Sequence, residues 1–394
     1  MLNFSNVQFN RNELSGAFGD IGTDLPLLVA LSFTTGLGIQ NIFIVFGVLQ
    51  ILTGVYYKIP MPVQPLKAVA TIAITQKLAG PVVLAGGFAI GILMFILSVS
   101  GLLGQIAKFI PKTVIRGLQF GLGISLCLLA CKEYIPSDGV PGLILSVFSF
   151  FLVITLIDNK KYPASLLIVM IGVIYFFIFK ENQIHFSNNH NIKFYDLTFL
   201  TPEFILKGFL LLTLPQIPLS IGNSILATKQ ISDDLFPHKK NLNVKKIGIT
   251  YSLLNLIAPI LSGIPCCHGS GGMVGHYTFG GRTGGSVVIY GIFYILIGIL
   301  SIFFTNSIVK IFPLPVLGVI LLFEGIAMIT MIKDTMDLKK DFIISIIVGI
   351  LAVGVQYGFL VGMLVGIVLC KLPIRFESMP KLKHNQNTKN HKES

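Results

Sequence analysis

Two short stretches determine the interpretation of this chain: Lys58–Pro65, which reads Lys-Ile-Pro-Met-Pro-Val-Gln-Pro, and Gly263–Ser270, which reads Gly-Ile-Pro-Cys-Cys-His-Gly-Ser. Both carry an Ile-Pro pair at the same place. A second pair of stretches, Ile110–Val114 and Phe312–Val316, is similar at nearly the same offset along the chain. Each match is weak alone, but the nearly constant offset indicates that the chain contains one internal repeat.

The composition predicts a membrane protein. Of 394 residues, 53% are hydrophobic and only 12% are charged, and the mean hydropathy is +0.82. Soluble domains carry about 25% charged residues, so this chain lacks the polar residues needed to cover a soluble core. Apolar runs near the length of a membrane span are Gln40–Tyr57, Val82–Leu103, Gly139–Ile157, Leu166–Phe179, Leu253–Leu261, Val287–Phe304, Val316–Ile332 and Phe342–Leu369. Allowing for interrupted spans, we expect about fourteen helices that cross the bilayer.

The distribution of charge predicts the topology. The formal net charge is +12. If the N-terminus is cytoplasmic and fourteen spans alternate, most of the 29 Lys and Arg residues fall in cytoplasmic loops and the C-terminal tail. This asymmetry explains the basic pI without a nucleic acid partner, and it places both termini in the cytoplasm.

The repeat divides the chain into four parts. Residues 1–180 form the first repeat, with an amphipathic N-terminal segment, Met1–Glu13, lying on the membrane before spans one to seven. Residues 181–203 form an extracytoplasmic loop, 204–372 the second repeat with spans eight to fourteen, and 373–394 a disordered basic cytoplasmic tail. Because seven is odd, the second repeat enters from the opposite side, which makes the repeat inverted.

The third span of each repeat is interrupted. Prolines before Leu66–Gln76 prevent an earlier helix, so Pro65 is expected at the first helical position with Gln64 as its cap. In the second repeat, a half-helix is expected to start near Gly269. Paired interruptions of this kind indicate a transporter's binding site. Two helix N-termini, each with unpaired N–H groups and partial positive charge, would bind a dianion.

Several motifs resemble those of the molybdate-transporter family. This family is a branch of the SulP sulfate permeases, and its members, unlike many SulP permeases, lack a cytoplasmic STAS domain. The motifs are Gly-Ala-Phe-Gly-Asp-Ile-Gly-Thr at 16–23, Pro-Met-Pro-Val-Gln-Pro-Leu-Lys at 60–67, Gly-Asn-Ser at 222–224, Asp-Asp-Leu-Phe-Pro at 233–237, Cys-His-Gly-Ser-Gly-Gly at 267–272 and Phe-Gly-Gly-Arg-Thr-Gly at 279–284. The resemblance implies an all-α integral membrane protein with a seven-plus-seven inverted repeat and core and gate domains like those of uracil permease. Asp24 departs from the family pattern, in which an uncharged residue is expected.

The expected function is secondary active transport of a tetrahedral oxyanion, molybdate or possibly sulfate, by alternating access coupled to H⁺ or Na⁺. The predicted substrate-binding residues are Thr23, Gln64, Lys67, Gln216, Asn223, His268, Gly269, Ser270 and Gly271. Asp20 and Asp24, spaced i, i+4, are the candidates for coupling. No cofactor is expected.

Structural alternatives stay open for most of these residues. Lys67 either attracts substrate or forms an ion pair with Asp20 or Asp24. The two aspartates either bind the coupling ion or have a structural role, in an ion pair or as a helix cap. His268 could donate to the anion, take the proton or cap the half-helix. Gln216 and Asn223 line the site or hold helices together. For Arg282 we expect a lipid phosphate or an inter-span carboxylate, and for Glu324 a gate-domain hydrogen bond.

Other classes of protein fit less well. A nucleobase permease of the same fold usually places a glutamate in span eight, where this chain has Gln216 and Asn223. An intramembrane enzyme would need a nucleophile–base pair, and His268 and Ser270 are too close in sequence to form one easily. Cys266 and Cys267 have poor spacing for a metal. An ion channel is less well supported, because paired broken helices in an inverted repeat favour alternating access. Membrane lipids are expected partners, and a homodimer is left open.

Overall fold

The computed structural model describes residues 7–156, 159, 163–180, 197–238, 242–304 and 310–373. Most of the predicted loop at 181–203 and nearly all of the predicted tail at 373–394 lie outside these residues. The segment Met1–Glu13 is described only from residue 7, and its helix begins at Arg11.

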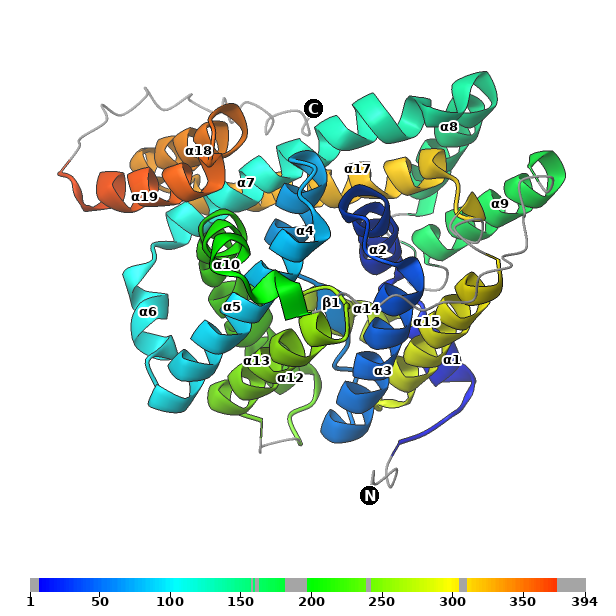
Figure 1. Ribbon diagram of the computed structural model, residues 1–394, viewed down its shortest axis with the longest axis horizontal. Coiled ribbons are helices and arrows are strands. Elements are labelled where there is room, and N and C mark those ends of the chain that lie inside the picture. The colour runs from blue at the N-terminus through cyan, green and yellow to red at the C-terminus, as the bar shows by residue number, and fades with distance from the viewer. Residues whose placement is uncertain are drawn as a thin grey trace, which may run out of the picture.

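The described chain is almost entirely helical (Figure 1). The first half contains α1 (Arg11–Ala17), α2 (Ile21–Thr35), α3 (Ile39–Tyr57), β1 (Val63–Pro65), α4 (Lys67–Thr75), α5 (Gly80–Ser100), α6 (Leu103–Phe109), α7 (Lys112–Leu129), η1 (Ala130–Tyr134), η2 (Ile135–Asp138), α8 (Gly139–Leu156) and α9 (Ala164–Phe179). The second half contains η4 (Leu197–Leu200), α10 (Pro202–Gly208), η5 (Phe209–Thr213), α11 (Leu214–Leu219), η6 (Ser220–Ala227), α12 (Thr228–Leu235), α13 (Val244–Ile260), β2 (Cys266–His268), α14 (Ser270–Thr278), α15 (Gly285–Phe303), α17 (Leu314–Thr330), η7 (Met331–Thr335), α18 (Lys339–Gly354) and α19 (Gly358–Lys371).

The internal repeat inferred from the sequence is present in the order of elements. The offset from the start of β1 to that of β2 equals the offset between the two short helices that follow them, α4 and α14. The offset from α3 to α13 likewise equals that from α5 to α15. Proline starts the same helix in both halves, since Pro111 and Pro313 are the N-cap residues of α7 and α17. The two interrupted spans are therefore equivalent positions of one repeat.

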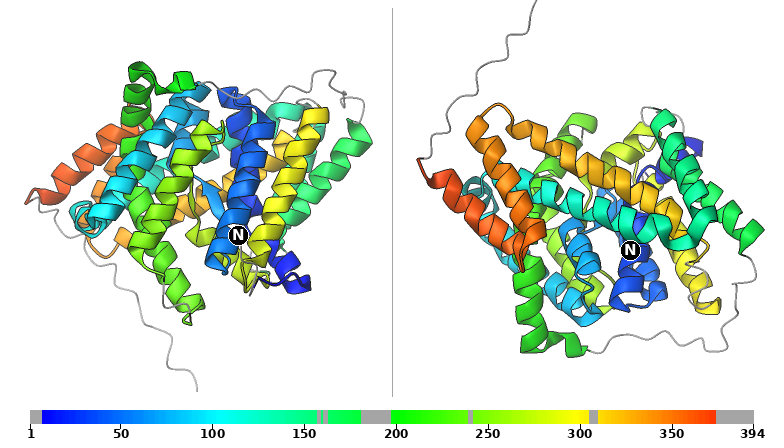
Figure 2. Two further views of the ribbon diagram at one scale, coloured as in Figure 1. Left: turned by 60° about the horizontal axis from the view of Figure 1, so that its bottom comes forward. Right: turned by 90° about the horizontal axis from the view of Figure 1, so that it is seen from above.

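The helices form two groups, and each group mixes the two halves. In the first, which we call the core group (α1–α5 and α10–α15), α3 packs along α15 and α5 along α13. In the second, the gate group (α7–α9 and α17–α19), α7 packs along both α17 and α18. Figure 1 shows α7 and α17 crossing the upper part of the molecule above α3, α5, α13 and α15, and Figure 2 shows the same two helices side by side from above. This interleaving agrees with the expected core and gate domains.

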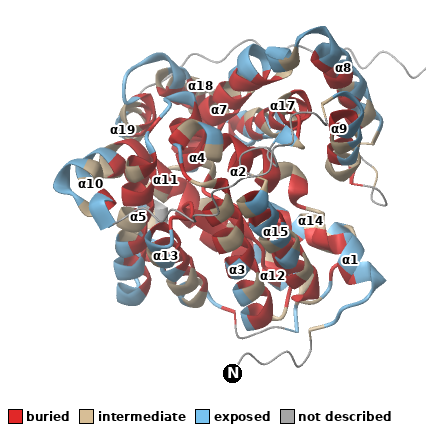
Figure 3. Cartoon of the chain, turned by 45° about the vertical axis from the view of Figure 1, so that its right-hand side comes forward, coloured by how far each residue is buried: buried red, intermediate tan, exposed pale blue. Residues whose placement is uncertain are grey.

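The outer surface suits a bilayer. Within the described residues, six helical stretches are long and apolar enough to cross a membrane, or seven if α1 and α2, bent by 45°, count as one span. One of the six, Lys112–Leu156, includes both α7 and α8. Figure 3 shows exposed faces on outer helices such as α8, where Ile144, Phe148 and Phe151 are more than half exposed. Apolar side chains on an outward face are stable in lipid. The count of about fourteen spans stays a prediction.

Candidate functional site

The centre of the molecule is a two-stranded antiparallel ladder formed by the two interrupted segments. Gln64 lies opposite Cys267, with Val63 opposite His268 and Pro65 opposite Cys266. Because the strands are antiparallel, α4 and α14 begin at opposite ends of the ladder. Both strands are fully buried, so their polar backbone groups need partners inside the protein.

Two buried amide side chains supply those partners. The Gln50 side chain on α3 donates to the carbonyl of Val63 at 2.7 Å and accepts from its N–H at 2.8 Å. The Asn255 side chain on α13 makes the same pair of bonds with Cys266, at 2.6 and 3.0 Å. Gln50 and Asn255 are related by the same offset as the helices that carry them. Each repeat therefore holds its own extended segment with an amide from the preceding helix. Sequence reasoning missed both residues, although their shared offset could have identified them.

The first half-helix starts later than predicted. α4 begins at Lys67 and its N-cap is Leu66, so the prediction of Pro65 at the first position with Gln64 as cap is wrong. Leu66 has extended backbone, with φ −64° and ψ 107°, because β1 continues through Pro65. Gln216 on α11 performs the capping instead. Its Oε1 accepts the N–H groups of Ala68 at 3.1 Å and Val69 at 3.3 Å.

The second half-helix starts as predicted and leaves its first turn open. Gly269 is the N-cap and Ser270 the first helical residue, and Gly269 donates its N–H to the carbonyl of Pro62 at 3.1 Å. The N–H groups of Ser270 and Gly271 form no hydrogen bond within the described part of the chain. These are the unpaired donors that give a helix N-terminus its affinity for anions.

A cavity of about 270 Å³ lies beside this open turn, between the core and gate groups. It is lined by Gln64, Lys67, Arg116, Gln119, Gln216, Leu219, Asn223, Ser224, Ala227, Cys267, His268, Ser270, Gly271, Met328 and Met331. Seven of the nine predicted substrate-binding residues are therefore brought together around one cavity. Thr23 and Gly269 are not among the lining residues.

The three glycines at the start of α14 have different surroundings. A Cβ added at Gly271 would meet no atom within 4 Å, so this position faces open space in the cavity. A Cβ at Gly269 would collide with the side chain of Gln64, and one at Gly272 with Asp20 and Pro62. Only Gly271 therefore leaves room for a ligand to approach the backbone, whereas Gly269 and Gly272 accommodate neighbouring side chains.

Two basic residues reach the cavity, one from each group. Lys67 on α4 forms an ion pair with Glu324 on α17, so the alternative in which it pairs with Asp20 or Asp24 is wrong. The Lys67 side chain is nevertheless 32% exposed. Arg116 on α7 donates to Gln119 at 2.8 Å and pairs with Asp334. Neither Arg116 nor Gln119 was predicted as a site residue, because the charge pattern assigns Arg116 to a cytoplasmic loop.

Asp20 and Asp24 are buried behind the cavity. Gln64 donates its side-chain N–H groups to both carboxylate oxygens of Asp20, at 2.7 Å each. Asp20 precedes α2 but does not cap it through its side chain. Asp24 accepts a hydrogen bond from the Tyr290 hydroxyl at 3.2 Å, while its other oxygen has no partner among the described residues. In the same part of the chain neither aspartate forms an ion pair.

The contacts of His268 and Arg282 test two further predictions. His268 lies in β2, one residue before the Gly269 cap, so it does not cap α14; its Nε2 is 2.7 Å from the Thr250 hydroxyl. The Arg282 guanidinium pairs with no carboxylate among the described residues, and the expected contact with a lipid phosphate stays a prediction. The guanidinium donates to the carbonyls of Tyr277 and Gly281 and stacks 3.7 Å from the centre of the Tyr277 ring.

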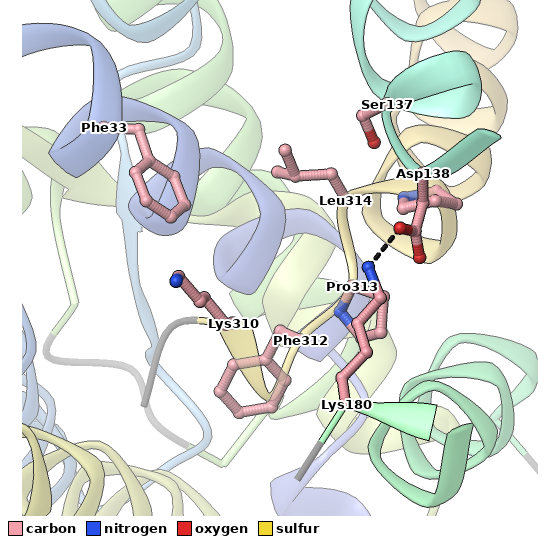
Figure 4. A pocket seen from close by; sticks show the side chains of 9 residues that line it. Phe33, Ser137, Asp138, Lys180, Lys310, Phe312, Pro313 and Leu314 are labelled. Carbon is pink, nitrogen blue, oxygen red and sulfur yellow. Dashed lines mark hydrogen bonds and ion pairs between the residues drawn. The ribbon is translucent and has the colours of Figure 1, made fainter. Parts of the chain in front are cut away.

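A second cavity, of about 260 Å³, lies at the other end of α17 (Figure 4). Its lining includes Phe33, Asp138, Lys180 and Lys310, and Lys180 forms an ion pair with Asp138. The first cavity adjoins the C-terminal end of α17 through Met328, and the second adjoins its N-terminal end through Leu314. The two cavities are therefore separated along the length of the gate group.

Comparison with known proteins identifies the family. A profile described as "Molybdate transporter of MFS superfamily" matches residues 12–126 and 208–328. Molybdate transporter 1 of Arabidopsis thaliana is 31% identical over 407 residues, covering 91% of this chain and 88% of the relative. Molybdate transporter 2 of the same plant is 31% identical and covers 85% of this chain and 82% of the relative.

Solved structures show the same fold. The transmembrane domain of a cyanobacterial bicarbonate transporter, BicA, matches with a TM-score of 0.66 and 16% identity, covering 93% of this chain and 99% of that one. The murine anion transporter Slc26a9 in the inward-facing state matches with a TM-score of 0.67 and 11% identity, covering 93% and 69%. These proteins and the sequence relatives are transporters and not enzymes. The chain therefore belongs to the molybdate transporter family and is a multi-pass membrane anion transporter.

Proposed function

We propose that this chain carries molybdate, or a similar tetrahedral oxyanion, across the membrane by movement of the core group against the gate group. The relatives named as molybdate transporters support the substrate. The cavity supports the mechanism, because it lies between the two groups and is lined by residues from both. A site at such a boundary can be exposed to one side and then the other.

The observation that carries the proposal is the set of donors around the cavity. The N–H groups of Ser270 and Gly271 at the start of α14 are free, and the ammonium of Lys67 comes from the core group and the guanidinium of Arg116 from the gate group. The lining residues include no carboxylate. An oxyanion with four acceptor oxygens fits donors on several sides. A neutral nucleobase would gain little from two cations and a helix N-terminus, which makes the permease alternative weaker.

The positive charge of the site is partly neutralised, and a carrier must be able to release its substrate. Lys67 and Arg116 each have an acidic partner, Glu324 and Asp334. The remaining polar donors, such as Ser270 and Asn223, are neutral. Because charge-assisted hydrogen bonds are roughly twice as strong as neutral ones, a cage of unpaired cations would release the ion slowly.

The orientation is also part of the proposal. Arg116 lines the cavity near the start of α7, and the same end of the gate helices carries Lys112, at the start of α7, and Lys333, in η7 after α17. The positive-inside pattern assigns this face to the cytoplasm, with both termini on the same side. In this arrangement the described conformation is open toward the cytoplasm.

Coupling to H⁺ or Na⁺ completes the proposed transport cycle. Asp20 and Asp24 remain candidates, because Asp20 is joined to the cavity through Gln64. If Asp24 is the group that binds the coupling ion, Asp24→Asn should abolish accumulation of substrate but leave passive exchange intact.

Uptake into proteoliposomes tests the function. Purified protein should accumulate radiolabelled molybdate, and unlabelled tungstate and sulfate should compete, because they share the tetrahedral shape and the double negative charge. Uracil should not compete. Uptake that uracil blocks and oxyanions do not would contradict the proposal.

A further inference from the structure

The Lys67–Glu324 ion pair joins the core group to the gate group at the edge of the cavity. Lys67 is the first residue of the half-helix α4, and Glu324 lies on α17, one turn before the cavity-lining Met328. The two side chains are 32% and 16% exposed. The pair is therefore partly buried, yet open enough for a small ion in the cavity to reach Lys67.

In the empty carrier Glu324 acts as the counter-ion of Lys67. An unpaired lysine at membrane depth is costly, so a lysine in this position needs an anion at all times. The carboxylate meets that need while the cavity is empty. Because the two residues belong to different groups, movement of the core group against the gate group must also separate them.

An oxyanion in the cavity competes with this carboxylate. A dianion beside Lys67 would place two further negative charges next to Glu324 in surroundings of low dielectric constant. Like charges at such short range strongly disfavour the ionised form of a carboxylate. Glu324 can leave Lys67 at low cost only if its charge is removed.

We propose that Glu324 is a proton-coupling residue: the oxyanion replaces its carboxylate at Lys67, and the displaced carboxylate binds one proton that crosses with the oxyanion. This inference rests on the proposed transport of an oxyanion. The proton comes from water on the side to which the cavity is open and forms the neutral carboxylic acid. On the other side the oxyanion leaves, the acid releases its proton, and the ion pair with Lys67 forms again.

The surroundings of Glu324 are compatible with this step. Besides Lys67, the titratable side chains closest to its part of α17 are Asp20 and Asp24, at and after the start of α2, which interact with it electrostatically, and Cys127 on α7. Among the described residues Glu324 forms no ion pair other than the one with Lys67, so a carboxylate displaced from Lys67 has no second cation to stabilise its charge. α8 carries no titratable residue. The titratable residues on the other elements packed against α17 lie toward its ends: Cys131, Lys132, Glu133, Tyr134, Asp138 and Tyr175 at its start, and Lys112, Arg116, Lys333 and Asp334 at its end.

Proton uptake on substrate binding tests the inference. Molybdate is added to purified protein in a weakly buffered solution, and the pH change and the affinity are measured together. The wild type should take up about one proton per molybdate bound. Glu324→Gln should take up none, and it should bind molybdate about tenfold more tightly because no carboxylate competes for Lys67. A merely structural role would weaken binding instead of strengthening it.

Matched variants separate the possible results. Asp138→Asn removes the carboxylate of the ion pair with Lys180 in the second cavity, so proton uptake and affinity should both stay at the wild-type values (Figure 4). Glu324→Asp keeps a titratable group and should retain proton uptake. If Glu324→Gln does not fold, the double variant Lys67→Gln/Glu324→Gln removes both charges. It should then bind molybdate more weakly and without a proton.

Three outcomes would overturn the inference. Undiminished proton uptake by Glu324→Gln, or by the double variant, would exclude Glu324 as the proton site. Binding of molybdate by the wild type without proton uptake would exclude coupling but leave the proposed function intact. If the wild type bound neither molybdate nor tungstate nor sulfate, the proposed function would fail and this inference with it.

Discussion

Gly271 lies in the first turn of α14, and a side chain at this position would point into the cavity. A Cβ there would meet nothing within 4 Å, and the residue itself lines the cavity. Its N–H is free for a ligand. A bulky side chain at this position should therefore weaken ligand binding without lowering the stability of the protein.

For Gly271→Val we expect molybdate affinity to fall by at least about tenfold, because the isopropyl group would fill space that the oxyanion needs; overpacking typically costs about 1–3 kcal/mol. The midpoint of thermal unfolding should not change. The matched control is Gly104→Val in α6, another helical glycine with nothing within 4 Å of an added Cβ, but away from the cavity. Equal affinity in both variants would show that the oxyanion does not contact the first turn of α14.

Gln64 and Ser270 should respond differently to truncation. Ser270→Ala removes a neutral donor next to the cavity and should weaken binding by about tenfold without affecting stability. Gln64→Ala should destabilise the fold by about 1–3 kcal/mol, because the buried Asp20 carboxylate loses the donors that Gln64 supplies. Thermal unfolding and calorimetric affinity, measured on the same preparations, distinguish the two. An unaltered unfolding midpoint in Gln64→Ala would contradict the structural role assigned to this residue.

Among the elements, the two half-helices occupy equivalent positions in the two repeats but differ in their capping. α4 has its first N–H groups bound by Gln216, whereas the first turn of α14 is open to the cavity. The partial positive charge of α14 is therefore available to a ligand, and that of α4 is already partly satisfied by an amide oxygen. The anion should lie closer to α14.

Gln216→Glu tests this asymmetry. A carboxylate can still accept the N–H groups of Ala68 and Val69, and a negative charge at a helix N-terminus is favourable, so stability should hold. The same charge lines the cavity and should reduce molybdate affinity by about tenfold or more through repulsion. Gln105→Glu on the exposed face of α6 is the control for added charge. If Gln216→Glu bound as tightly as the wild type, Gln216 would lie too far from the anion to matter.

The two broken helices could be predicted from the sequence, but the residues that they contact in the other repeat could not. Proline and glycine act locally, so the interruptions before α4 and α14 and the repeat offset could be predicted from residue order. The start of α4 was misplaced because β1 holds Leu66 extended, and that depends on pairing with a strand of the other repeat, far away in the sequence. The Lys67–Glu324 pair was missed for the same reason, since it joins residues of opposite repeats.

At the scale of the whole molecule, the two cavities lie at opposite ends of α17 and only the one between the half-helices contains the predicted binding residues. In the proposed orientation, Lys333 faces the cytoplasm and Lys310 the opposite side. The gate group would then separate two aqueous openings, as alternating access requires.

Labelling of introduced cysteines checks this orientation. In a background with the native cysteines replaced, Lys333→Cys should react with a membrane-impermeant thiol reagent only in inside-out vesicles. Lys310→Cys should react only in right-side-out vesicles, because its side chain is exposed at the second cavity. Reaction of both from the same side would refute the topology.

The central claim is that the oxyanion binds in the cavity between the open end of α14 and Lys67. Molybdenum is heavy enough to locate directly by its anomalous X-ray scattering in crystals grown with molybdate. An anomalous peak is expected within hydrogen-bond distance of the N–H groups of Ser270 and Gly271. A peak only in the second cavity beside Lys180 and Lys310, with the first cavity empty, would contradict it.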